Sequence, residues 1–410
     1  RRQRQMCIRD RACFEGQAPN RFYHGQKAGS YTRGITANKR GFTVRKGTRL
    51  VRLTRLPEDS CLNWSVDAGS AADEGDQRLA MRVGEDLVMN TDLWFWKGPM
   101  ERDILVDVEL PKGMNISVPW APTGKPFQFR PYKTPSSWVS RTAIGRFPVQ
   151  EFSAGSGRFR LAALGDMDSG QQSKFEQWIS HTAESVSSVC GVFPREQMQV
   201  LIIPIGTRRQ PVPWAHVVRG GGIAAEFFVN ENAGLSDLRK DWTASHEFSH
   251  ALLPFVSRRD RWLSEGLASY YQNVLRARDG RLTEQEAWRK LESGFERGRR
   301  ATRSGSLAQA TRSGWGSIMR VYWSGAAMML KADSRLRALS GGSQSLDTAL
   351  NSLETCCMDP GRSWRARDLL LELDRLTGYT VFSDLYDSHV LDDQFPDLAR
   401  TYVQLGIVPG

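Results

Sequence analysis

The 410-residue sequence contains no run of eighteen apolar residues, and it therefore predicts no membrane-spanning helix. It contains only six histidines and six cysteines. The cysteines, at positions 7, 13, 61, 190, 356 and 357, have none of the spacings that hold a metal ion. Buried free thiols are their expected state. One disulfide is compatible with these positions, but the adjacent Cys356 and Cys357 are not expected to bridge each other.

Basic residues are in excess, but they are not grouped along the chain. Lys and Arg number 56 against 45 Asp and Glu, which gives a net charge of +11. No basic run alternates with aromatic residues as in a binder of single-stranded nucleic acid. The first eleven residues, RRQRQMCIRDR, hold five arginines and one aspartate, so they carry +4 of the +11 and leave +7 for the rest. The sequence therefore predicts no nucleic-acid partner.

Residues 1–11 resemble the translation of a sequencing adapter. We interpret them as an artefact and exclude them from the fold. Under this interpretation the natural N-terminus is missing, so the lack of a signal peptide says nothing about export. The sequence also leaves the oligomeric state open.

The composition and the periodicity of apolar residues change along the chain. Residues 12–155 are rich in Gly, Pro, Thr and Val and carry short alternating runs such as Ile104–Leu110, which are typical of a sandwich-like antiparallel β domain. Residues 156–280 mix strand-like and helix-like segments, and residues 281–410 are mainly helical, beginning with a capping box at Thr283 and Glu286. We therefore predict a multidomain α+β protein with an N-terminal β domain, a mixed central domain and a C-terminal helical domain.

The segment TASHEFSHALLP, residues 243–254, carries the strongest chemical signal. His246 and His250 are four residues apart, so a helix running from Ser236 to Pro254 would place both imidazoles on one face. Glu247 stands beside the first histidine, where it can reach a water on a metal ion without being a ligand. This HExxH arrangement favours a zinc site over two unrelated helix histidines.

A catalytic zinc site needs three protein ligands and a water. The predicted third ligand is Glu265, and fourteen residues separate it from His250. That length allows a helix end, a turn and a second, antiparallel helix with Asp260 as its N-cap. We therefore predict one zinc ion per chain, held by His246, His250 and Glu265.

HEFSH followed by WLSEGLASYY resembles the gluzincin metallopeptidases, the clan of thermolysin, and within that clan it is most similar to the glycyl aminopeptidase family. The resemblance implies a thermolysin-like catalytic domain at residues 156–280, between a β-rich domain and a helical domain. It extends to the run VYWSGAA at Val321–Ala327, where Tyr322 matches a tyrosine that helps to hold the oxyanion. These motifs cover roughly residues 240–340.

Two features depart from the pattern of the clan. The spacer between HExxH and the downstream glutamate is short, and the Gly-x-Met-Glu-Asn motif that reads a free amino terminus in alanyl-type aminopeptidases is absent. The nearest equivalent is a triple glycine, which allows either close approach of a peptide or a mobile loop. The expected substrate-binding residues are Arg219, Gly220, Gly221, Gly222 and Glu226.

We expect residues 222–229 to form an edge strand that pairs with a peptide backbone. Glu226 on this strand has an even chance of facing the zinc, where its carboxylate would hold the α-ammonium group of a substrate. His216 is expected to line the cleft without joining the metal ligands.

The resemblance implies hydrolysis of peptide or protein substrates, with Glu247 as general base and Tyr322 as oxyanion donor. An aminopeptidase is the expected activity. An endopeptidase of the same clan is the first alternative, and an inactive binding protein with this fold is the second. The habit of the family favours a periplasmic or secreted location, which the residues themselves leave open.

Overall fold

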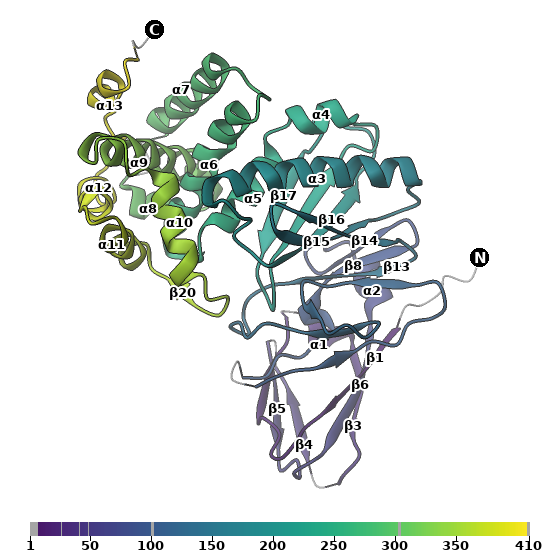
Figure 1. Ribbon diagram of the computed structural model, residues 1–410. Helices are drawn as coiled ribbons and strands as arrows, with labels where there is room; N and C mark the ends of the chain where they lie inside the picture. Colours follow the sequence, from purple (N-terminus) through teal and green to yellow (C-terminus); the bar gives the residue numbers. More distant parts are fainter. Residues whose placement is uncertain are drawn as a thin grey trace.

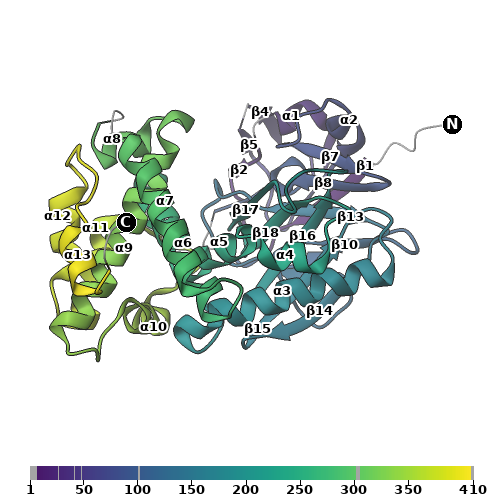
Figure 2. The ribbon, with the colours of Figure 1, turned by 90° about the horizontal axis from the view of Figure 1, so that it is seen from above.

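The computed structural model describes residues 7–25, 27–40, 42–47, 49–99, 102–301 and 305–407. Three parts follow one another along the chain: a β-rich part, a mixed sheet with helices on one face, and a helical part (Figure 1). The mixed sheet adjoins both other parts (Figure 1), and from above the helical part lies on the left, with the mixed sheet and the β-rich part on the right (Figure 2). This is the multidomain α+β arrangement expected from the sequence. In the described part of the chain, no helix has the length and apolar character needed to cross a membrane.

The N-terminal part is built from short strands that pair antiparallel around a core rich in tryptophan. Its elements are β1 (Cys7–Cys13), β2 (Arg21–Tyr23), α1 (Ala28–Tyr31), β3 (Thr32–Ala37), β4 (Thr43–Lys46), β5 (Leu50–Thr54), β6 (Cys61–Asp67), α2 (Ala68–Asp73), β7 (Ala80–Val83), β8 (Asp86–Asn90), η1 (Thr91–Leu93), β9 (Val106–Asp107), β10 (Asn115–Ser117), β11 (Ala121–Pro122), β12 (Gln128–Arg130) and β13 (Arg141–Gly145). They form sheets with the orders β1-β6-β3, β2-β5-β4, β10-β13-β8-β7 and β11-β12-β9. Of the alternating run Ile104–Leu110, only the two residues of β9 are a strand.

Residues 7–11 belong to the fold, so the expectation that they lie outside it is wrong. The strand β1 pairs with β6 in continuous register, from Cys7 opposite Asp67 to Cys13 opposite Cys61. Alternate residues of β1 are half-buried, an alternation that composition alone does not report. Residues 1–6 lie outside the described residues, and the adapter origin of the segment stays a prediction.

Four of the cysteines are paired. Cys13 forms a disulfide with Cys61 at the end of the β1–β6 ladder. Cys356 and Cys357 form a second disulfide, contrary to the expectation that these neighbours do not bridge. That expectation considered only their adjacency in the sequence, whereas the two residues lie at the C-terminal end of a helix, where the chain leaves helical geometry. Cys190 is a buried free thiol, as expected.

The central part is a five-stranded mixed sheet. Its strands are β14 (Val149–Ala154), β15 (Gly157–Ala163), β16 (Gln197–Pro204), β17 (Trp214–Val218) and β18 (Ala224–Val229). Their order is β14-β15-β16-β18-β17, with β15, β16 and β18 parallel and the two edge strands antiparallel. Because β14 and β15 form a hairpin within this sheet, the boundary expected at residue 155 falls inside the sheet rather than before it.

The edge strand near the helices is β17, and not residues 222–229 as expected. The strand β18 pairs with β16 on one side and with β17 on the other. Its residues are all buried, which is typical of an interior strand. The free backbone edge that could accept a peptide therefore belongs to Trp214–Val218.

Helices cover one face of this sheet, and strands β7, β8 and β13 cover the other. The covering helices are α3 (Ser169–Cys190), α4 (Leu235–Lys240) and α5 (Thr243–Ser249), the last followed by the 3-10 turn η2 (His250–Leu252). The single helix expected from Ser236 to Pro254 is thus divided. The division lies at Asp241, which is extended and accepts a 2.7 Å hydrogen bond from the backbone N–H of Thr243.

The last part of the chain is mainly helical, and its helices begin before residue 281, the expected start of the helical domain. Its elements are β19 (Phe255–Val256), η3 (Arg258–Asp260), α6 (Arg261–Arg278), α7 (Glu284–Arg300), α8 (Leu307–Arg312), η5 (Trp315–Ser317), α9 (Ile318–Leu339), α10 (Leu346–Cys357), β20 (Ser363–Trp364), α11 (Ala366–Thr377), α12 (Val381–His389) and α13 (Ala399–Gln404). The predicted capping box at Thr283 and Glu286 begins α7. Asp260 is the N-cap residue of α6, as predicted.

Helices α6 and α9 cross at two glycines. A Cβ on Gly266 would lie 2.4 Å from the backbone of Gly325, and a Cβ on Gly325 would lie 2.3 Å from the carbonyl oxygen of Trp262. Both contacts are with backbone atoms, which cannot rotate away. The two helix axes therefore lie closer together than they could with any other pair of residues at these positions. Glu265 on α6 is directly beside this crossing.

We predict that Gly325→Ala destabilises the protein by about 1–3 kcal/mol, because the added methyl group overpacks this crossing. Gly316→Ala is the control, since no atom lies within 4 Å of a Cβ at Gly316. Thermal unfolding of the two variants measures the difference. Equal melting temperatures would show that the crossing can relax and does not constrain the helices.

Candidate metal centre

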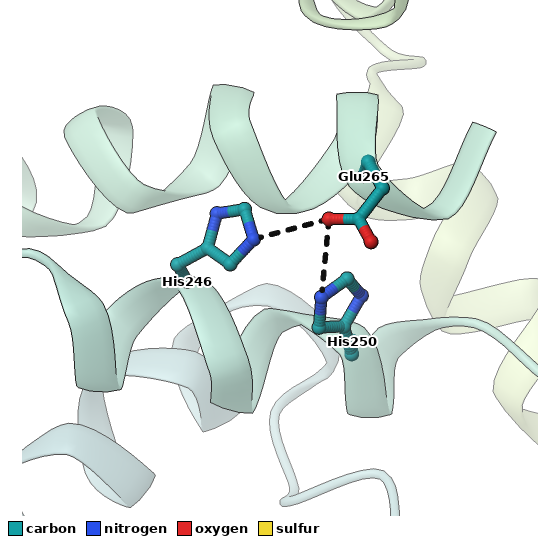
Figure 3. A group of neighbouring side chains, drawn as sticks. All are labelled: His246, His250 and Glu265. Carbon is teal, nitrogen blue, oxygen red and sulfur yellow. Dashed lines mark hydrogen bonds and ion pairs between the residues drawn. The ribbon is translucent and has the colours of Figure 1, made fainter. Parts of the chain in front are cut away.

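Three side chains from two antiparallel helices converge on one point (Figure 3). His246 lies on α5, His250 follows at its C-cap, and Glu265 lies on α6. The Oε2 atom of Glu265 is 3.3 Å from Nε2 of His246 and 3.6 Å from Nε2 of His250. Ligand atoms on a tetrahedral zinc, at about 2.0–2.1 Å from the metal, are themselves about 3.3–3.4 Å apart. The two distances from Glu265 are thus close to the spacing of zinc ligands, and all three ligand atoms lie within 4.8 Å of one another.

Each imidazole is oriented by a second residue on α6. Nδ1 of His246 is 2.9 Å from the amide oxygen of Gln272, and Nδ1 of His250 is 2.8 Å from the hydroxyl of Ser264. The amide oxygen can only accept, so it assigns the proton of His246 to Nδ1 and leaves the Nε2 lone pair for a metal. Partners of this kind fix the ring and raise the basicity of the ligand.

Sequence reasoning missed Ser264 and Gln272. The sequence does carry a weak signal for Gln272, which is seven residues after Glu265 and therefore on the same face of a helix. Ser264 carries no such signal, because it precedes Glu265 directly and becomes recognisable only when α5 is in place.

The charges of His250 and Glu265 suit a cation. Burial lowers the pKa of His250 to about 4, with further lowering by the charges of His246 and Arg219, so the ring is neutral at neutral pH. Burial raises the pKa of Glu265, but the neighbouring histidines outweigh it and bring the value to about 2, so this carboxylate is ionised. Two imidazoles and one carboxylate are a ligand set of known catalytic zinc sites.

Glu247 is buried beside the first histidine, with 8% of its surface exposed. Burial raises its pKa to about 7; the charge of His246 lowers it, and the carboxylate of Glu265 raises it. A carboxyl group with a pKa near neutrality is suited to taking up and releasing a proton.

Tyr322 on α9 lies against the same cluster. Its ring stacks on that of His246, with centroids 5.6 Å apart and an angle of 7° between the planes. Its hydroxyl hydrogen-bonds Glu265. Burial, then the carboxylates of Glu265 and Glu247, raise its pKa far above the ordinary value, so the phenol keeps its proton and can donate. The sequence placed Tyr322 at the site, and the structure brings it there.

The triple glycine packs against the N-terminal part of the chain. A Cβ on Gly220 would lie 2.6 Å from the carbonyl oxygen of Trp138, and one on Gly222 would lie 1.9 Å from that of Pro119. A Cβ on Gly221 would meet the indole of Trp120 at 2.7 Å. The close approach at Gly220, Gly221 and Gly222 is therefore to the N-terminal part of this chain, and their role as substrate-binding residues stays a prediction.

Arg219 holds the backbone at the end of the helix that carries the two histidines. Its guanidinium donates to the carbonyl oxygen of His250 and, at 3.1 Å, to that of Leu253. These carbonyls lie at the end of the metal-binding helix, where they have no intrahelical partner. Arg219 thus positions the segment that carries His250, a role that differs from the expected contact with substrate.

Glu226 faces away from the metal centre. Its neighbours Ala225 and Phe227 pack toward the helices, so its own side chain points to the opposite face of the sheet. There its carboxylate is fully buried, 2.6 Å from Nε of Arg141 and 3.0 Å from Nε2 of His216. With two partners already present, Glu226 is not available to an α-ammonium group, and that expectation is wrong.

No protein-family model and no curated protein sequence matches the chain. Solved structures do match its fold. An aminopeptidase N family protein from Idiomarina loihiensis is 14% identical with a TM-score of 0.72, over 97% of this chain and 76% of that one. An M1 zinc metallopeptidase from Deinococcus radiodurans, bound to a Tyr-Ser-Ala substrate, is 13% identical with a TM-score of 0.60, over 96% of this chain and 91% of that one.

Leukotriene A4 hydrolase from yeast, in complex with bestatin, is 13% identical with a TM-score of 0.60, over 96% of this chain and 66% of that one. At these identities the likeness establishes the fold. The chain has the fold of the M1 zinc metallopeptidases, and the expectation of a gluzincin fold is confirmed. The narrower likeness to the glycyl aminopeptidase family stays a prediction.

We predict that Gln272→Leu lowers zinc affinity by about 10- to 100-fold, because His246 loses the acceptor that fixes its ring. Competition with a chelator of known affinity measures the change. Gln285→Leu is the matched control, since Gln285 is exposed on α7. The orienting role would be disproved by equal zinc affinities of the two variants.

Proposed function

We propose that this protein is a zinc-dependent peptidase that binds one zinc ion through His246, His250 and Glu265 and hydrolyses peptide bonds. The observation that carries the proposal is the convergence of these three ligand atoms beside Glu247 and Tyr322. The fold supports it, since the matching solved structures include M1 zinc metallopeptidases and an aminopeptidase N family protein. When bound, zinc would supply Lewis-acid polarisation of the scissile carbonyl and of the attacking water.

The chain's own residues carry the proton transfers. Glu247 accepts a proton from the attacking water and passes it to the nitrogen of the leaving amine, which its pKa near neutrality favours. The Tyr322 hydroxyl, protonated because its pKa is raised, donates a hydrogen bond to the oxygen that becomes negative. The free edge of β17 is the place where the backbone of an extended substrate would pair.

The mode of cleavage has two candidates. The likeness to the aminopeptidase N family protein supports removal of residues from a free N-terminus, which is the activity we propose. The engagement of Glu226 by Arg141 and His216 favours the alternative, an endopeptidase, because the carboxylate assigned to the α-ammonium group is occupied. An inactive binding protein is the weaker alternative, since every group that the chemistry needs is in place.

We predict that Glu247→Gln binds zinc like the natural protein but loses at least about 100-fold in turnover, because the amide cannot accept the proton of water. Zinc content and cleavage of a defined peptide mixture, followed by mass spectrometry, measure the two properties. Tyr322→Phe is the companion variant and should lower kcat far more than it raises KM. Near-normal turnover of Glu247→Gln would remove Glu247 from the mechanism.

A second prediction concerns the mode of cleavage. An aminopeptidase should cleave a free-amine peptide and leave its N-acetylated twin intact, because acetylation removes the ammonium charge that such an enzyme must read. Time-resolved mass spectrometry of the two peptides shows which bonds are cut. Cleavage of both at the same internal bond would contradict the aminopeptidase and establish the endopeptidase.

A further inference from the structure

A cavity of about 610 Å³ lies directly beside the metal centre, between helices α6, α7 and α9. Gln272 and Tyr322 line it, and these two residues also contact the ligands His246 and Glu265. Its volume is typical of a pocket that binds a small ligand, about 300–1,000 Å³. We call this space the α6–α7–α9 cavity. A substrate that reaches the metal centre from this side would therefore occupy part of it.

One face of α6 runs from the metal ligand into this cavity. Ser269, Asn273 and Arg276 follow Glu265 at intervals of four, eight and eleven residues, which places them on one side of the helix. Each is almost wholly buried and yet carries a polar side-chain atom without a hydrogen-bond partner among the described residues: Oγ of Ser269, Nδ2 of Asn273 and Nε of Arg276.

Unpaired buried polar groups are costly, and an ordered water or a ligand is the usual partner of such groups. The amide nitrogen and the guanidinium nitrogen can only donate, and the hydroxyl can also donate. A ligand that satisfies all three must supply hydrogen-bond acceptors. A carboxylate does so with two oxygens and about four lone-pair sites.

The charges around the cavity also favour an anionic ligand. Its lining includes the cations Arg276, Arg289, Lys290 and Arg297, against one carboxylate, Glu286. That carboxylate accepts hydrogen bonds from the backbone and hydroxyl of Thr283 and so caps α7. A cleft lined by charges of one sign concentrates ligands of the opposite sign.

We propose that the α6–α7–α9 cavity binds a carboxylate of the peptide substrate, supplied either by an acidic side chain or by the C-terminus. This inference rests on the proposed peptidase function and adds the class of substrate. Because four cations would repel an α-ammonium group, the amino terminus of a substrate would lie outside this cavity. The apolar side chains of Trp242 and Met319, both exposed at the rim, would cover the uncharged part of the same substrate.

The test uses matched tetrapeptides in which one position carries Glu, Gln or Lys, each with a free and with an amidated C-terminus. Two properties are measured: kcat/KM with the zinc-loaded natural protein, and affinity by calorimetry with zinc-loaded Glu247→Gln. We expect the peptide with the extra carboxylate to be preferred by about tenfold or more over its neutral twin, and Lys peptides to be the poorest. Preference for Glu over Gln identifies a side chain as the source, and preference for the free over the amidated end identifies the C-terminus.

The double variant Arg289→Glu with Lys290→Glu should reduce this preference by about tenfold or reverse it. Both residues are exposed, so the change is not expected to affect folding, and thermal unfolding verifies this. Arg312→Glu on α8 is the control, since Arg312 is exposed and does not line the cavity. Equal affinity for the charged and neutral peptides, or a preference unchanged in the double variant, would overturn the inference. Failure of the peptidase proposal would look different: selective binding by calorimetry would remain, but the natural protein would cut no peptide.

Discussion

The close crossing of helices α6 and α9 is the constraint on which the candidate site depends. At this crossing Gly266 and Gly325 let the two backbones touch, so residues on both helices reach the same small volume. Glu265 stands immediately before one glycine, and Tyr322 stands three residues before the other. A side chain at either glycine would separate the helices and move the Tyr322 hydroxyl away from Glu265. The Tyr-x-x-Gly spacing in the sequence is therefore a packing requirement that has a chemical consequence.

The packing of α5 against α6 brings the two histidines to Glu265. Helix α5 is packed against α6 so that one oxygen of Glu265 faces two imidazoles, while Gln272 and Ser264 hold the far side of each ring. Three buried ionisable groups in so small a space are expensive unless a cation or a proton compensates them. The pKa of Glu265 is lowered to about 2 and that of Glu247 is raised to about 7, so one carboxylate is ionised and the other titrates near neutrality. In the proposed peptidase the first would be a zinc ligand and the second would carry the proton.

The sequence was sufficient for the motif but not for its surroundings. Helical spacing placed His246 and His250 on one face with Glu247 beside them, and the length of the following connection allowed Glu265 to return to them. Tyr322 was identified only through the resemblance of its motif to the gluzincins. Glu226 could not be assigned correctly, because the order of strands decides which face and which edge are free. A run such as Ala224–Val229 reads the same whether the strand lies inside a sheet or at its edge.

The ends of helices and strands also could not be predicted from local sequence patterns. The division between α4 and α5 depends on one hydrogen bond from Thr243 to Asp241, and no periodicity reports it. The membership of residues 7–11 in the fold depends on their pairing with β6, far along the chain. Long-range pairing of this kind is invisible to a composition argument, whereas the buried helices of the C-terminal part follow from local patterning alone.

X-ray absorption at the zinc K-edge tests the central claim, that α5 and α6 together hold a catalytic metal. The account predicts that the purified protein takes up one zinc per chain, with two imidazole nitrogens and one or two oxygens at about 2.0–2.1 Å and no sulfur in the first shell. Absence of stoichiometric zinc, or a sulfur ligand at about 2.3 Å that would place the metal at cysteines instead, would contradict it.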